Sequence, residues 1–124
     1  MSEVEKLSAV ELRRLKRALE VIIEELGTQT TLRQVISLIT IALSNQAGKV
    51  VGVRDLDRAL GDLSPGSASK LLKPMMHVET ARKAGIANTV IAERDPNDLR
   101  SWNLHLTPKA VDALEEVLDA MHGR

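Results

Sequence analysis

The fold of this chain is decided by one stretch, Arg94–Lys109, which reads RDPNDLRSWNLHLTPK. Apolar and polar residues alternate from Ser101 to Leu106, and this alternation is the period-2 signature of a strand with one apolar face. The residues before that strand, Pro96–Asp98, favour a tight turn. Thr107 followed by Pro108 is a typical start of a helix. The stretch therefore predicts a turn, a strand and a capped helix in succession.

A partner strand is predicted before the turn, from Asn88 to Arg94. Two short strands joined by a turn form a β-wing, and here Arg94 and Arg100 flank the turn. An arginine on a wing can enter the minor groove of DNA, where narrow A·T-rich segments concentrate negative potential. The alternative is a solvated hairpin whose local ion pairs contribute little.

Two long amphipathic helices are predicted at the ends of the chain. The first, Glu3–Leu26, would be about 36 Å long and would end at Gly27. The last would run from Pro108 to about His122. Both carry apolar stripes with three- and four-residue spacing, made of Leu12, Leu15, Leu19, Ile22 and Leu26 in the first, and of Val111, Leu114, Leu118 and Met121 in the last. Such stripes can pair with each other, across a dimer, or both.

A central helix is predicted after the first one. Thr31 and Gln34 match a capping box, and the apolar residues that follow cover a broad face until Asn45–Gly48 ends the helix. The short apolar run Val50–Val53 is then compatible with a strand.

A helix-turn-helix is predicted next. Arg54–Gly61 forms a two-turn helix, Ser64 caps a second helix, and Pro65 occupies its first position, where a missing N–H costs nothing. Pro74 cannot donate a hydrogen bond and crowds the preceding turn. We therefore expect a kink or break there, with a further helical piece over Met75–Lys83.

Composition favours one packed, mainly helical domain. The chain has 124 residues, 44% of them hydrophobic, and Trp102 is its one aromatic residue, so the core must be aliphatic. Cysteine is absent, which excludes disulfides and zinc–thiolate sites. No apolar run approaches the roughly 20 residues that span a membrane. We expect a soluble, cytoplasmic protein without a membrane partner.

The charge is zero overall but unevenly distributed. Residues 49–83 carry seven basic residues against four acidic ones, whereas both ends of the chain are acidic. This pattern fits a central recognition module held by terminal helices. A net charge of zero argues weakly against an indiscriminate nucleic-acid binder.

With these elements in place, the chain resembles the MarR-type winged-helix regulators. The wing of that family reads Asp-x-x-Asp-x-Arg, then a strand, then Leu-Thr-x-x-Gly. Here Asp95–Arg100 is followed by Ser101–His105 and Leu106–Ala110, with alanine in place of the glycine. Ser64–Leu72 is similar to the start of the family's recognition helix. The chain departs from the family in a longer Ser64–Gly85 segment and a shorter closing helix.

The resemblance implies a single domain over residues 1–124, mainly α with a small β-wing (α+β). The winged helix-turn-helix core would span residues 50–106, with dimerisation helices over 3–26 and 108–122. It further implies a homodimer on double-stranded DNA. Members of the family often respond to small aromatic acids, and the near absence of aromatic residues here favours a different small-molecule effector or none.

Contacts with DNA are expected at the start of the second helix and on the wing. The N-terminal part of that helix enters the major groove, where Ala68 would touch a thymine methyl and Lys70 and Lys73 would reach phosphate or guanine. By resemblance, Arg100 reads the minor groove, and Asp98 orients Arg100 or ties the wing to the domain. The predicted DNA-binding residues are Ser64, Gly66, Ser67, Ala68, Ser69, Lys70, Lys73, Arg94, Asn97 and Arg100.

The remaining residues that could carry chemistry favour structural roles. We expect Trp102 in the core rather than in a ligand pocket, together with Met75 and Met76. The histidines lack metal-ligand spacing, and no nucleophile elbow, phosphate loop or acid–base pair is present. We therefore expect no catalytic residues, no metal and no cofactor.

The sequence favours a sequence-specific, double-stranded DNA-binding transcriptional regulator, a repressor, over an enzyme. Its recognition helix would lie in the major groove and its wing in the minor groove. The alternative is a winged-helix module that contacts a protein and has no DNA specificity of its own, which the neutral charge and Pro74 favour.

Overall fold

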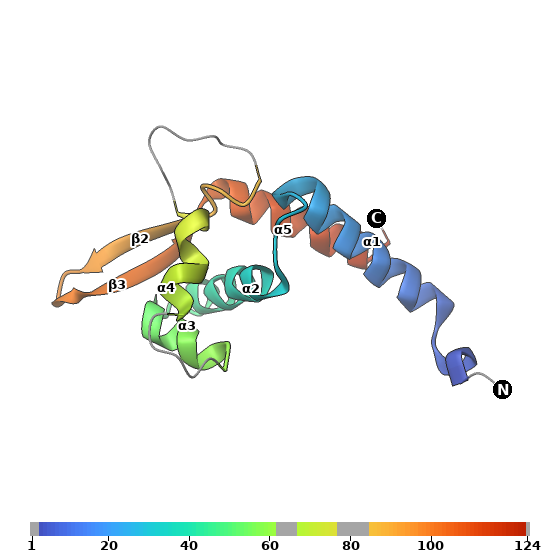
Figure 1. Cartoon of the computed structure of the whole chain (residues 1–124), viewed down its shortest axis with the longest axis horizontal. Coiled ribbons are helices and arrows are strands. Elements are labelled where there is room, and N and C mark those ends of the chain that lie inside the picture. The colour runs from blue at the N-terminus through green and yellow to red at the C-terminus, as the bar shows by residue number, and fades with distance from the viewer. Residues whose placement is uncertain (1–2, 62–66, 77–84, 124) are drawn as a thin grey trace.

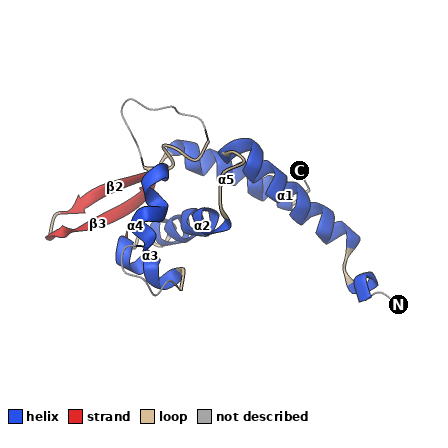
Figure 2. Cartoon of the chain, in the orientation of Figure 1, coloured by secondary structure: helices blue, strands red, loops and turns tan. Residues whose placement is uncertain are grey.

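A computed structural model of the chain describes residues 3–61, 67–76 and 85–123 (Figure 1). The elements, in chain order, are the 3-10 helix η1 (Glu3–Lys6), α1 (Ala9–Leu26), α2 (Leu32–Gln46), β1 (Val51–Gly52), α3 (Val53–Ala59), α4 (Ser67–Leu72), the 3-10 helix η2 (Lys73–Met75), β2 (Val90–Asp95), β3 (Asp98–Leu106) and α5 (Pro108–Met121). Helices dominate and one small sheet is present (Figure 2), which confirms the predicted fold class.

The molecule is elongated, with the wing at one end and the N-terminal helix at the other (Figure 1). The strands β2 and β3 project from a central body made of α2, α3 and α4. The helices α1 and α5 lie side by side and extend away from the wing. The predicted recognition elements and the predicted dimerisation helices therefore occupy opposite ends.

The sheet has three antiparallel strands in the order β1-β3-β2, so β3 is central. The pairing of Asp95 with Asp98 leaves Pro96 and Asn97 as a two-residue turn. Both wing strands thus reach closer to the tip than predicted, and β2 begins at Val90 instead of Asn88. The difference arises because backbone pairing continues to the polar tip, where apolar and polar residues do not alternate and the sequence therefore does not predict a strand.

One aliphatic core joins the helices to the sheet. Its largest fully buried side chains come from every central element and include Leu26, Leu38, Ile41, Leu56, Leu72, Met75, Val90 and Leu104. Met75 is therefore a core residue, as predicted. Burial of this much aliphatic surface is the main driving force for folding a domain that has a single aromatic residue.

The helix ends follow local signals at most places. Thr31 and Gln34 form the predicted capping box, and Gly27 ends α1 with a positive φ of 94°. The expectation of one continuous helix from residue 3 to 26 is wrong, because Ser8 caps α1 by accepting the N–H of Glu11 at 3.2 Å. The segment before Ser8 is the separate 3-10 helix η1.

Pro74 ends the helical region, as its chemistry predicts. The α-helix α4 stops at Leu72, and the turn around Pro74 is a short 3-10 helix. Met76 is already extended, with ψ of 151°, and forms a parallel bridge with Val90. The helical continuation predicted from Met75 is therefore wrong at Met76, and the rest of it lies outside the described residues.

The helices α1 and α5 meet through small side chains. Ala18 and Val21 of α1 pack against Val117 and Ala120 of α5, and all four residues are buried. The predicted stripes behave differently. Their members nearest the core, such as Leu26, are buried, whereas an outer set stays exposed, namely Leu12, Leu15, Leu19, Val111, Leu118 and Met121.

Thr107 and Lys109 join the start of α5 to the loop before β2. The Thr107 hydroxyl accepts the N–H of Ala110 and donates to the carbonyl of Asn88 at 2.7 Å. The Lys109 ammonium donates to the carbonyls of Gly85 and Ala87, both at 2.7 Å, and its burial lowers the pKa of Lys109. The base of the wing is therefore tied to α5 by several polar contacts.

We expect the Thr107→Val substitution to lower the free energy of unfolding by about 2 kcal/mol, because it removes a helix cap and the hydroxyl that donates to the Asn88 carbonyl. Urea denaturation measures the change. Thr40→Val is the matched control, because the Thr40 hydroxyl only donates back to Ile36 in the same helix. Equal midpoints for the two variants would contradict the assigned role of Thr107.

Candidate nucleic-acid interface

The helices α3 and α4 form the predicted helix-turn-helix, and one face of α4 is anchored in the core. Ala68 and Leu72 of α4 are fully buried together with Leu56 of α3. The other face of α4 carries Ser69 and Lys70, which are exposed, as is Lys73 in the following turn. A hydroxyl and two cations therefore point away from the core, as a surface that contacts DNA requires.

Ala68 does not belong to that surface. Its side chain is fully buried in the hydrophobic core, so its methyl group cannot reach a thymine methyl. The predicted DNA contact of Ala68 is therefore wrong. Sequence reasoning placed it on the outer face because Ala68 is small, but a small residue is equally suited to the close packing of two helices.

Asp57 of α3 holds the first turn of α4. Its carboxylate oxygen Oδ1 accepts the backbone N–H of Ala68 at 2.8 Å. A helix of six residues is too short to be stable alone, and the first N–H groups of a helix lack partners within it. The contact from α3 thus supplies a partner for one of these groups. Sequence reasoning missed it because the two residues belong to different helices.

On the wing, Arg94 and Trp102 form a stacked pair. They face each other across β2 and β3, and the guanidinium carbon of Arg94 lies 4.7 Å from the centre of the Trp102 ring. A cation at this distance over an indole face is attracted by the ring quadrupole. The pair fixes the direction in which the Arg94 charge points.

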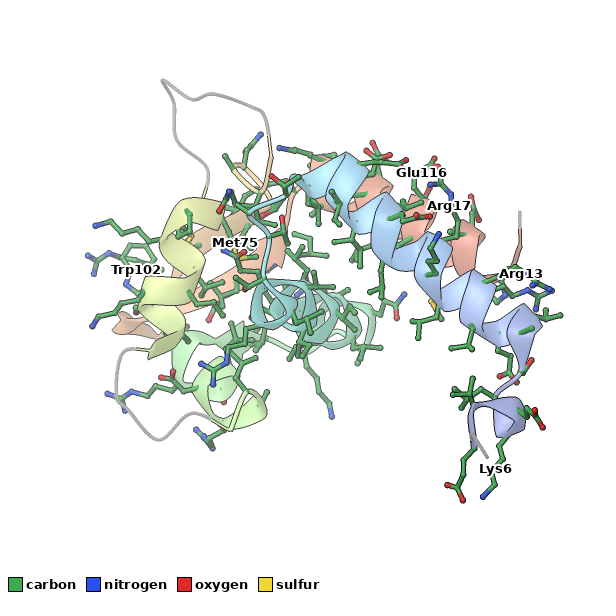
Figure 3. The ribbon with its side chains drawn as sticks, turned by 45° about the vertical axis from the view of Figure 1, so that its right-hand side comes forward. Lys6, Arg13, Arg17, Met75, Trp102 and Glu116 are labelled. Atoms are coloured by element: carbon green, nitrogen blue, oxygen red, sulfur yellow. The ribbon has the colours of Figure 1, made fainter. Side chains whose placement is uncertain are left out.

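Trp102 is not a core residue, contrary to expectation. Its side chain is 40% exposed, although Leu104, two residues later on the same face of β3, is fully buried. The core stops at Leu104, and the strand carries Trp102 beyond it towards the tip of the wing. Leu104 belongs to the same core as Leu56 and Leu72, so Trp102 projects from the face of the sheet that carries this core. Figure 3 labels Trp102 at the outer side of the molecule.

The tip of the wing is shaped by Asp95. Its carboxylate accepts the backbone N–H of Asn97 at 2.8 Å, an arrangement in which an aspartate stabilises its own turn. Asn97 is exposed at the tip, and Arg100 lies on β3. The side chains of Asp98 and Arg100 lie outside the described residues, as do Ser64, Gly66 and the side chain of Ser67, so these predictions remain predictions.

Exposed cations lie on α4, in the turn after it and on the wing. These are Lys70, Lys73 and Arg94, and Glu93 is an exposed acidic residue on the same strand as Arg94. Within residues 3–61, 67–76 and 85–123, no group of three or more side chains is arranged to hold a metal ion. No helix in the described ranges is long and apolar enough to cross a membrane.

Comparison with solved structures gives several matches to regulators over nearly the whole chain. A MepR mutant from a multidrug-resistant S. aureus clinical isolate has a TM-score of 0.65 at 16% identity, with 99% of this chain and 78% of the other covered. YusO from Bacillus subtilis has a TM-score of 0.60 at 18% identity, and the match covers 99% of this chain and 80% of the YusO chain. The repressor CouR, bound to a 23-mer DNA duplex, has a TM-score of 0.57 at 21% identity, and the match covers 100% of this chain and 79% of the CouR chain.

These likenesses show that the chain has the MarR-type winged-helix fold. Comparisons with protein-family models and with curated proteins gave no match. The order of elements, the three-stranded sheet and the helix-turn-helix all agree with the fold that the sequence predicted.

We expect Asp57→Ala to weaken the first turn of α4 by about 1 kcal/mol, because the Ala68 N–H loses its partner. Hydrogen exchange of the amides of residues 69–72 should then be about fivefold faster. Asp57→Asn keeps an oxygen acceptor and should stay near wild type, and Asp112→Ala, at an exposed position of α5, is the control. Unchanged exchange in Asp57→Ala would refute the capping role.

Proposed function

We propose that the chain is a sequence-specific, double-stranded DNA-binding transcriptional regulator, a repressor that acts as a homodimer in the cytoplasm. In this proposal α4 lies in the major groove and the wing lies against the adjacent minor groove. The DNA-binding residues are Ser64, Gly66, Ser67, Ser69, Lys70, Lys73, Arg94, Asn97 and Arg100. The small-molecule effector, where one acts, is of unassigned chemistry.

The observation that carries the proposal is the exposure of cations on two separate elements that are anchored in the same core. Lys70 on α4 and Lys73 in η2 are exposed, and Arg94 is exposed on the wing, where it stacks on Trp102. Both elements are fixed by buried neighbours, α4 by Leu72 and the wing by Leu104. Cations held in one orientation can meet the regularly spaced phosphates of a duplex.

The exposed apolar stripe of α1 supports the homodimer. Leu12, Leu15 and Leu19 remain exposed although α5 packs along the same helix. Contiguous apolar surface of this kind marks contact sites in proteins that are otherwise polar outside. A two-fold dimer would present two copies of α4 about 34 Å apart, the spacing of successive major grooves.

The first test measures the salt dependence of binding. Sequencing of the DNA that co-purifies with the protein supplies the duplex, and fluorescence anisotropy gives its affinity at about 50 and 200 mM salt. We expect the affinity to fall steeply with salt. Lys70→Ala should weaken binding and reduce the slope of log K against log salt by about 0.9 for each copy of the chain, because each copy loses one phosphate contact.

The control for this test is Lys16→Ala. Lys16 is an exposed lysine on α1, paired with Glu20, on the helix that extends away from the wing. The Lys16→Ala substitution should leave the slope of log K against log salt unchanged. If the protein binds no DNA but co-purifies with a stoichiometric protein partner, the alternative of a protein-binding winged helix replaces this proposal.

Trp102 offers an independent readout, because it is the only tryptophan in the chain. We expect its fluorescence to change in intensity or wavelength when the duplex binds, since Trp102 is half-exposed on the wing beside Arg94. Arg94→Ala should weaken binding and alter the starting emission by removing the stacked cation. Emission that stays constant while anisotropy reports full binding would place the DNA away from this face.

A further inference from the structure

Residues 85–89, which we call the joint, lead into the wing strand β2. They lie where the end of α1, the start of α5 and the base of the wing meet (Figure 1). Gly85 and Asn88 have positive φ angles of 69° and 61°. A residue other than glycine keeps such a conformation when the contacts around it hold it there. The joint is therefore ordered by its neighbours and not by a helix or a strand of its own.

Both terminal helices hold the joint through its backbone. From α5, the Lys109 ammonium donates to the carbonyls of Gly85 and Ala87, both at 2.7 Å. From the end of α1, Gly27 approaches so closely that a Cβ atom built on it would lie 3.4 Å from the Cα atom of Gly85. The joint is thus in contact with the two long helices that extend away from the wing.

The turn after α4 holds the joint from the other side. The buried Thr89 donates its backbone N–H to the carbonyl of Met75 at 2.9 Å and its hydroxyl to the carbonyl of Ile86 at 2.8 Å. Met76 then forms a bridge with Val90 at the start of β2. These bonds join α3, α4, η2 and the wing into one unit, which we call the reading module. The joint is where this module meets the terminal helices.

The apolar core and the joint act differently at this boundary. Leu26 of α1 and Ala110 of α5 are buried in the same core as Leu72 of α4, which keeps the terminal helices against the reading module. Hydrophobic contact has no preferred direction, whereas a hydrogen bond weakens steeply when its angle changes. The angle between α5 and the reading module is therefore set by the polar contacts that Thr107 and Lys109 make with the joint.

Lys109 restrains this angle more than Thr107 does. Thr107 lies between the end of β3 and the start of α5, so it is itself the hinge between the wing and the helix. The Lys109 ammonium reaches two carbonyls of the joint, away from that hinge, and a contact away from a hinge restrains rotation more than a contact at it. The positive charge also makes each of these bonds stronger than a bond between neutral groups.

We propose that Lys109 is a positioning residue that sets the angle between the reading module and the terminal helices by holding the carbonyls of Gly85 and Ala87. Its consequence for DNA rests on the proposed function. In a homodimer, two copies of α4 fit successive major grooves when each reading module keeps a fixed angle to the helices that carry it. Lys109 then controls how the two half-sites are matched without contacting DNA.

Pulsed electron paramagnetic resonance on the free protein tests the angle, and the absence of cysteine allows specific spin labelling. One pair of labels joins the wing tip to α5, at Asn97→Cys and Glu116→Cys, and a second pair lies within the reading module, at Asn97→Cys and Arg54→Cys. All three positions are exposed, and an excess of unlabelled chain suppresses distances between copies. We expect Lys109→Met to widen the first distance distribution about twofold and to leave the second unchanged. Lys109→Arg keeps charged donors and should restore the narrow distribution.

Lys49→Met is the matched control, because it removes the same charge from an exposed lysine before β1 and should leave both distributions unchanged. Circular dichroism shows whether each variant is folded. Lys109→Gln, which keeps an uncharged donor, replaces Lys109→Met with the same expectation if that variant does not fold. An unchanged distribution between residues 97 and 116 would overturn the proposal. Widening of both distributions would overturn it as well, since it would show a general loss of order.

Binding to DNA separates a positioning role from a lost DNA contact. The duplex that co-purifies with the protein is used whole and shortened to one half-site. We expect Lys109→Met to weaken binding to the whole duplex about tenfold and to leave half-site binding and the salt slope nearly unchanged, because two linked contacts need a matching geometry. Equal weakening on both duplexes would contradict the matching role. If the unsubstituted protein binds neither duplex, the proposed function fails, while the distance measurement still decides the role of Lys109.

Discussion

The hydrogen-bonded position of β3 between β1 and β2 is the constraint on which the rest of the structure depends. One half of β3 places Leu104 in the core, the other half carries Trp102 and the turn away from it, and the strand ends at the Thr107 cap of α5. The strand β3, which is paired on both sides, therefore connects the core, the wing and the terminal helix α5. The direction of the wing relative to α4 follows from this pairing, because Leu72 and Leu104 lie in the same core.

The apolar residues of α1 form two surfaces that differ in side-chain size, one that packs on α5 and one that is exposed. The seam with α5 is made of Ala18, Val21, Val117 and Ala120, which allow the two helices to approach closely. The larger aliphatic residues, such as Leu15 and Leu19, stay on the outside. A chain that needed α1 only as a cover for its own core would gain stability by burying the leucines. Their exposure is what a surface shared with a second copy requires.

Features that depend on neighbours in sequence could be predicted, and features that depend on the tertiary arrangement could not. The Thr31 and Thr107 caps, the break at Pro74 and the alternation in β3 are local, because each is set by residues within one or two turns. The exposure of Trp102, the burial of Ala68 and the Asp57 contact depend on where the core ends and on which helices meet. The break at Ser8 had a local signal, a serine before a helical run, but the longer apolar stripe outweighed it.

The shortness of α4 has a consequence for recognition. A six-residue helix has no independent stability, so its order comes from Leu72 and Ala68 in the core and from the Asp57 carboxylate at its start. The outward side chains Ser69 and Lys70 keep a fixed direction only while these inward contacts persist. If α4 docks on DNA, binding free energy and local folding free energy of α4 are coupled. Substitutions beneath α4 will then weaken DNA binding as effectively as substitutions on its surface, without removing a single contact to the duplex.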